Sequence, residues 1–166
     1  MRSNVPDVIY PMNNALISLG SNIEPEKNLV QAVSMLRNEF DFLKLSSVIE
    51  TAPEGASGPN FLNAVAGFQT ILTEEQLKIE VLRKIESNLG RIRTRDKNAP
   101  RSIDMDIVIF NDNVLNANIW DQIYIASPLS ELLPDFLNPK SGLTLLQTSR
   151  ELKERSFWKA RPDVLL

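Results

Sequence analysis

The 166-residue sequence contains no cysteine and no histidine. The lack of cysteine excludes disulfides, thiolate metal sites and cysteine nucleophiles, and it leaves the redox compartment undecided. The lack of histidine removes the usual general base at neutral pH. Any chemistry must therefore rest on carboxylates, cations, a metal ion and the positioning of substrates.

The sequence also has no long apolar run and no strong excess of one charge. No segment has the length of a signal peptide or a membrane span, so we expect a cytoplasmic protein without a membrane partner. The net charge of −3 gives no reason to expect a nucleic-acid partner. We expect a monomer or weak homodimer with a single domain over residues 1–166, comprising a loose lead-in at 1–13 and a C-terminal helix and tail at 141–166.

Residues 99–110 carry the most chemical information, because they read as a strand entered from a basic loop. Apolar residues at positions 103, 105, 107 and 109 alternate with Asp104, Asp106, Val108 and Phe110. Side chains alternate faces along a strand, so the two aspartates project from one face about 6.5–7 Å apart. Two carboxylates held in this way repel each other unless a cation lies between them, and oxygen donors suit Mg²⁺.

Basic residues gather just before this strand, at positions 91, 93, 95, 97 and 101. A carboxylate pair beside several cations is what a metal–polyphosphate complex needs, because the acids hold the metal and the bases hold phosphate oxygens. The alternative is a solvated, charged strand end with surface ion pairs.

The order of the expected elements predicts an α+β fold. Strands at 15–19, 43–51, 61–70 and 103–110 are separated by helices that begin at Pro25 and Thr73, and further helices follow at 128–133 and 144–153. This is the ferredoxin-like βαββαβ arrangement, an antiparallel sheet with helices on one face, plus C-terminal helices. We expect the aspartates on a central strand, and loops rather than helices over the other face, leaving a groove.

The strand at 61–70 follows a long loop rich in glycine and proline. Phe61 and Asn63 share one face and place an aromatic ring and an amide at the mouth of this loop. That pair suits a flat heterocycle, whose face stacks on the ring and whose edge binds the amide. The alternative is a packed phenylalanine and an asparagine that stabilises the turn.

Three segments resemble the 6-hydroxymethyl-7,8-dihydropterin pyrophosphokinase (HPPK) family of folate synthesis. They are Leu19-Gly20-Ser21-Asn22, the stretch from Ser47 to Asn63, and the stretch from Gly90 to Phe110 with its Pro100-Arg101-x-x-Asp104-x-Asp106 pattern. The resemblance covers roughly residues 15–139, and the family has a ferredoxin-like α+β fold.

The resemblance implies that the hydroxymethyl oxygen of the pterin attacks the β-phosphorus of ATP and that AMP leaves. It implies two Mg²⁺ ions held by Asp104 and Asp106, with Arg91 and Arg101 also catalytic. The implied pterin-binding residues are Thr51, Ala52, Glu54, Phe61, Asn63 and Tyr124. The implied nucleotide-binding residues are Arg83, Glu86, Arg93, Arg101 and Ile107.

The chain departs from the family pattern after the aspartate strand. The family has a Pro-His-aromatic step and a further arginine there, but the segment from Asn116 to Tyr124 is too short to contain them. Asn98 stands where the family has tryptophan. The sequence therefore predicts a short form of the enzyme. Two alternatives stay open: a catalytically weakened homologue that binds a pterin or nucleotide as a sensor or partner subunit, and a sheet that binds single-stranded RNA on an open face.

Overall fold

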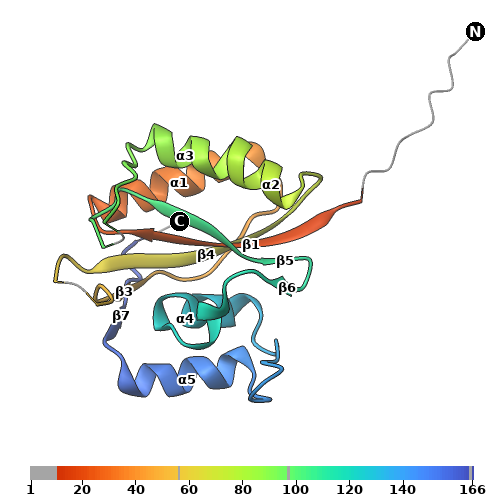
Figure 1. Ribbon diagram of the computed structural model, residues 1–166, viewed down its shortest axis with the longest axis vertical. Helices are drawn as coiled ribbons and strands as arrows, with labels where there is room; N and C mark the ends of the chain where they lie inside the picture. The colour runs from red at the N-terminus through yellow and green to blue at the C-terminus, as the bar shows by residue number, and fades with distance from the viewer. Residues whose placement is uncertain (1–10, 56, 97, 165) are drawn as a thin grey trace, which may run out of the picture.

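The computed structural model describes residues 11–55, 57–96, 98–164 and 166. Strands and helices alternate in the first two thirds of the chain, and helices dominate the last third (Figure 1). The elements are β1 (Asn13–Ser21), α1 (Pro25–Glu39), β2 (Lys44–Leu45), β3 (Ile49–Thr51), β4 (Phe61–Thr70), α2 (Glu74–Gln76), the π-helix η1 (Leu77–Leu82), α3 (Arg83–Asn88), β5 (Asp104–Phe110), β6 (Asn113–Val114), the 3₁₀-helix η2 (Ala117–Trp120), α4 (Ile123–Leu132), α5 (Leu145–Arg155) and β7 (Trp158–Ala160).

The strands form one antiparallel sheet in the order β6-β5-β1-β4-β3-β7, and β2 also pairs with β4. The inner order β5-β1-β4-β3 is that of a ferredoxin-like sheet, which confirms the α+β fold expected from the sequence. The expected strand at 43–51 is divided into the short strands β2 and β3.

The expectation that the aspartates lie on a central strand is wrong. The last strand of this topology pairs with the first strand, so β5 lies outside β1 while β1 and β4 occupy the middle. Within the described residues, β5 has an outer neighbour only at Ile109 and Phe110, which pair with β6. Its aspartate end therefore lies at the edge of the sheet.

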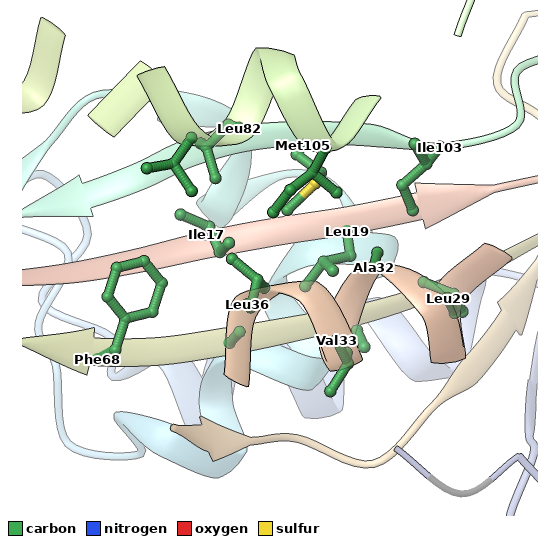
Figure 2. Close-up of a cluster of buried hydrophobic side chains, with 14 of the residues drawn as sticks. Ile17, Leu19, Leu29, Ala32, Val33, Leu36, Phe68, Leu82, Ile103 and Met105 are labelled. Carbon is green, nitrogen blue, oxygen red and sulfur yellow. The ribbon is translucent and has the colours of Figure 1, made fainter. Parts of the chain in front are cut away.

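One face of the sheet packs against α1 and the helical segment from α2 to α3. Leu29, Ala32, Val33 and Leu36 recur at helical spacing in α1 and contact the apolar face of the sheet (Figure 2). Burying each large side chain of this cluster contributes about 1.5–3 kcal/mol. Helix α2 begins with the predicted capping box, in which the Thr73 hydroxyl accepts a hydrogen bond from the Gln76 N–H at 3.2 Å.

The second face of the sheet is covered by helices, not by the loops expected from the sequence. Helices α4 and α5 lie on the side opposite α1 (Figure 1), and Ile125, Leu129 and Leu145 pack there against Val65. Most of α4 is buried, so it lacks the one-sided periodicity that reveals a surface helix, and it contains Pro128. Because helices cover this face, the premise of an open RNA-binding sheet fails.

A bulge in β5 changes the predicted alternation. Leu16 pairs with Ile109 but Ile17 pairs with Ile107, so Val108 is an extra residue in the strand. Ile109 therefore packs in the second cluster with Val108, and Phe110 contacts the first. The alternation is correct from Ile103 to Ile107, the part that orients the aspartates.

The C-terminal segment adds an edge strand rather than an irregular tail. Trp158 to Ala160 pair antiparallel with Thr51 to Ile49, so β7 extends the sheet beyond β3. No helix in the described ranges has the length and apolar character needed to cross a bilayer.

Candidate active site

A cavity of about 490 Å³ opens at the sheet edge where the resemblance places the substrates. All six residues expected to bind the pterin line it, together with Arg101, Asp104 and Asp106. They come from β3, β4, β5, α4 and the loops that follow β3 and precede β5. The structure thus brings together residues that lie up to 73 positions apart, between Thr51 and Tyr124.

Small residues of β1 form the floor of this cavity. In the sheet, Gly20 pairs with Asn63 on one side and with Asp104 on the other, and Ser18 pairs with Asp106. A Cβ atom on Gly20 would lie 3.2 Å from Asn63 Oδ1 and 3.8 Å from Phe61 Cδ1. The lack of a side chain at Gly20 therefore leaves room between the amide and the carboxylate.

The segment that follows β1 fixes the backbone at Arg101. The Asn22 side-chain oxygen accepts a hydrogen bond from the Arg101 N–H at 2.7 Å, and the Asn22 N–H donates to the Arg101 carbonyl at 3.1 Å. Ser21 Oγ donates to the Ser102 carbonyl. Two of the segments that carry the family resemblance thus hold each other in place.

The aromatic and amide side of the cavity is largely buried. Asn63 Nδ2 donates to Thr51 Oγ1 at 3.0 Å, and both residues are less than 5% exposed. Tyr124 enters from α4 and lines the same cavity as Phe61. Burial is the main cause that raises the pKa of Tyr124, the nearby Glu54 charge adds to it, and a hydrogen bond with Asn118 opposes it.

The two carboxylates differ in their surroundings. Asp104 is paired with Arg101 Nη1 at 2.5 Å and with Arg91 Nη2 at 3.4 Å. Asp106 is more exposed than Asp104. Partial desolvation by the cavity raises the pKa of Asp106, and the charge of Asp104 raises it further, against the effect of nearby cations.

The pair fits a divalent cation of the Mg²⁺ type. Both side chains offer oxygen donors from the same side of β5, and their mutual repulsion would be relieved by a cation. Within the described part of the chain, no group of three or more acidic or other metal-binding side chains converges. Two protein carboxylates suffice for Mg²⁺, which usually keeps several waters and binds substrate phosphates.

The residues expected to bind the nucleotide are more scattered. Glu86 is 2% exposed, and its two oxygens accept hydrogen bonds from the Met105 N–H at 2.9 Å and Arg93 Nη2 at 2.5 Å. Arg83 is exposed on α3, and the Ile107 side chain packs in the first core cluster. None of these four residues lines the cavity, so their nucleotide roles stay predictions.

Sequence reasoning did not identify three asparagines as site residues. Asn98, Asn116 and Asn118 line the cavity, and the Asn116 side chain also accepts a hydrogen bond from the Asn118 N–H at 3.0 Å. Isolated asparagines in loops are common because they stabilise turns. The only available signal was that they occupy the region where the chain departs from the family pattern.

The comparisons with known proteins agree on one family. The family described as 7,8-dihydro-6-hydroxymethylpterin-pyrophosphokinase (HPPK) matches residues 16–134. A Synechocystis protein named 2-amino-4-hydroxy-6-hydroxymethyldihydropteridine pyrophosphokinase is 27% identical over 165 residues, covering 93% of this chain and 84% of the relative.

Longer proteins also contain a matching region. The folic acid synthesis protein fol1 of Schizosaccharomyces pombe is 33% identical over 155 residues, which cover 86% of this chain but 21% of the relative. A solved HPPK-DHPS chain of Plasmodium falciparum has a TM-score of 0.67 at 13% identity, covering 90% of this chain and 47% of that chain, and supports the fold alone. From the family match and the enzyme relatives, the chain belongs to the HPPK family and is a pyrophosphokinase of folate synthesis.

Proposed function

We propose that this chain carries out its family's reaction in the cavity around Asp104 and Asp106, transferring pyrophosphate from ATP to 6-hydroxymethyl-7,8-dihydropterin. The observation that carries the proposal is the convergence of the acid pair, Arg101 and the aromatic–amide pair on one cavity. The pterin oxygen forms a bond to the β-phosphorus, the bond from that phosphorus to the AMP oxygen breaks, and the alcohol proton is released.

The pterin lies at the loop side of the cavity in this proposal. Phe61 and Tyr124 bind the two faces of the ring, and the Asn63 amide with the backbone of Thr51, Ala52 and Glu54 binds its edge. The hydrogen bond from Asn63 to Thr51 fixes the amide orientation before the substrate arrives. Orientation of this kind contributes much of the rate in a reaction that needs no covalent intermediate.

The phosphates lie at the aspartate side. Asp104 and Asp106 would hold the two Mg²⁺ ions, and Arg91 and Arg101, which pair with Asp104 here, would then bind phosphate oxygens. Bound Mg²⁺ supplies charge neutralisation and orients the phosphates. We assign Arg83, Glu86, Arg93 and Ile107 to the nucleotide end, and we propose that the protein works in the cytoplasm as a monomer or weak homodimer.

The test is the formation of AMP from ATP, Mg²⁺ and the pterin alcohol. Asp104→Asn and Asp106→Asn each remove one carboxylate from the pair, and we expect each to lower the rate by about 10²–10³-fold, as removal of a key transition-state contact does. Asp112→Asn removes a carboxylate from the turn after β5 and should leave the rate within about twofold.

The second candidate is a pterin-binding homologue without transfer activity. The feature that favours it is the short segment from Asn116 to Tyr124, which brings the neutral amides of Asn116 and Asn118 to the cavity wall and has no room for the histidine and arginine of the family pattern. Tight binding of the pterin by wild-type protein, with no AMP formed at any Mg²⁺ concentration, would favour this candidate over the enzyme.

A further inference from the structure

A side-chain hydrogen bond joins the two stems of the loop that forms the pterin side of the cavity. Strands β3 and β4 pair at Thr51 and Phe61, and the segment between them brings Ala52, Pro53 and Glu54 to the cavity wall. Asn60, the loop residue just outside the last pair, donates a hydrogen bond through Nδ2 to Oε1 of Glu50 at 2.8 Å. Glu50 lies one residue inside the Thr51–Phe61 pair and Asn60 one residue outside it, so this bond runs diagonally across the neck of the loop.

The C-terminal segment holds the other oxygen of Glu50. Arg161 Nη1 donates to Glu50 Oε2 at 3.1 Å, and the Arg161 side chain is only 17% exposed. The backbone places Arg161 there, because β7 pairs with β3 and the Arg161 N–H donates to the Val48 carbonyl at 2.9 Å. The Asn60 hydrogen bond, and then Arg161, lower the pKa of Glu50, so its carboxylate is charged at neutral pH.

Arg161 is itself anchored on the opposite side. Its Nη2 atom lies 2.9 Å from Glu26 on α1 and 2.7 Å from Asp163. A planar guanidinium can hold several carboxylates at fixed angles, which a flexible lysine ammonium does less well. Arg161 therefore connects a rigid helix to the neck of the substrate loop, from a position beyond the family match at residues 16–134.

We propose that Arg161 is a positioning residue for the pterin: through Glu50 and Asn60 it holds Thr51, Ala52 and Phe61 in the geometry that receives the ring. The proposal rests on the function proposed above for the identity of the ligand. It does not require Arg161 to touch the substrate, since Arg161 is not among the residues that line the cavity. Loss of the Arg161 guanidinium should therefore weaken binding of the pterin and leave binding of ATP unchanged.

Arg161→Met tests this directly, because methionine keeps part of the apolar stem and removes the guanidinium. We expect amide hydrogen exchange at residues 50–52 and 60–62 to rise by about tenfold, and KM for the pterin to rise about tenfold, as for the loss of one charged hydrogen bond. KM for ATP should change by less than about twofold. Glu50→Met should reproduce both effects, and the double variant should add little to either single change, because both act through one route.

Glu26→Gln is the matched control, since it weakens one anchoring ion pair of Arg161 while Asp163 and the backbone bond to Val48 still hold the guanidinium beside Glu50. Amide hydrogen exchange at residues 50–52 and 60–62 and KM for the pterin should both stay within about twofold of wild type. Equal effects of Glu26→Gln and Arg161→Met, equal rises in both KM values, or unchanged exchange in Arg161→Met would overturn the proposal. Exchange needs no turnover, so failure of the proposed reaction would be seen separately as a wild-type protein that forms no AMP.

Discussion

At the scale of single residues, Gly20 has the most sharply defined role in the cavity. It lies between Asn63 and Asp104 in the sheet, and a methyl group there would press on the Asn63 oxygen at 3.2 Å. Such an approach is closer than an ordinary van der Waals contact, so the amide or Phe61 would have to move. The space at Gly20 thus keeps two pterin-binding side chains in position.

We therefore expect Gly20→Ala to raise KM for the pterin by about five- to tenfold, because small displacements at a binding site are costly. The free energy of unfolding should change by less than about 1 kcal/mol, since alanine is no worse than glycine in a strand. Steady-state kinetics and urea denaturation measure the two quantities. Gly58→Ala is the control, because a Cβ at Gly58 meets nothing within 4 Å. Unchanged pterin binding in Gly20→Ala would contradict the assigned role.

Many residues of the cavity could be predicted from the sequence, because their common face depends only on neighbouring positions in one strand. Phe61 and Asn63 lie two positions apart on one strand, as do Asp104 and Asp106, so alternation alone gives each pair a common face. Asn116 and Asn118 could not be predicted in this way, because only the path of η2 brings them to the cavity.

At the scale of elements, Glu86 joins α3, β5 and the basic loop. Its buried carboxylate accepts from the Met105 N–H and from Arg93, and these two hydrogen bonds connect three segments of the chain. The family resemblance implied a nucleotide-binding role for Glu86. The two hydrogen bonds add a structural reason for the acid at this position.

We predict that Glu86→Gln lowers the free energy of unfolding by about 1–3 kcal/mol, because the amide cannot replace the charged bond to Arg93 in a buried site. Chemical denaturation measures the change. Glu80→Gln, on the exposed side of the same helical segment, should stay within about 0.5 kcal/mol of wild type. Unchanged stability would contradict this structural role, and a rise in KM for ATP would separately support the proposed nucleotide contact.

The elements that were wrongly predicted from the sequence have structures that depend on contacts with distant parts of the chain. The bulge at Val108 arises from pairing with β1, and α4 is buried on most sides and so has no amphipathic pattern. By contrast, the helix from Thr73 was predictable because its capping box and its apolar spacing are local.

At the scale of the whole molecule, Arg161 joins α1, β3 and the C-terminal segment. The hydrogen bond from Arg161 is the main cause that lowers the pKa values of Glu26 and Asp163. For Glu50 the hydrogen bond from Asn60 is the larger cause, and Arg161 lowers the pKa further. A carboxylate whose pKa is lowered by folding stabilises the protein fully above its ordinary pKa, here 4.5 for the glutamates and 3.8 for Asp163. That stabilisation is lost as the pH falls through the lowered values.

We expect Arg161→Met to unfold at lower urea concentration than wild type at pH 7, and this difference to shrink below about pH 4, where wild type loses the same interactions. Urea midpoints at both pH values measure it. Lys27→Met removes a cation from an exposed pair with Glu24 and should have little effect at either pH. A difference between Arg161→Met and wild type that grows in acid would show that the carboxylates are not the relevant partners.

The central claim concerns which bond of ATP is broken in the cavity of Asp104 and Asp106. Its most direct measurement is the nucleotide product formed per pterin consumed, with ATP, Mg²⁺ and the pterin alcohol mixed with wild-type protein. Transfer of a pyrophosphoryl group predicts one AMP for each pterin, with none formed by Asp106→Asn in the same time. Production of ADP in place of AMP, or AMP formation that survives the loss of Asp106, would contradict it.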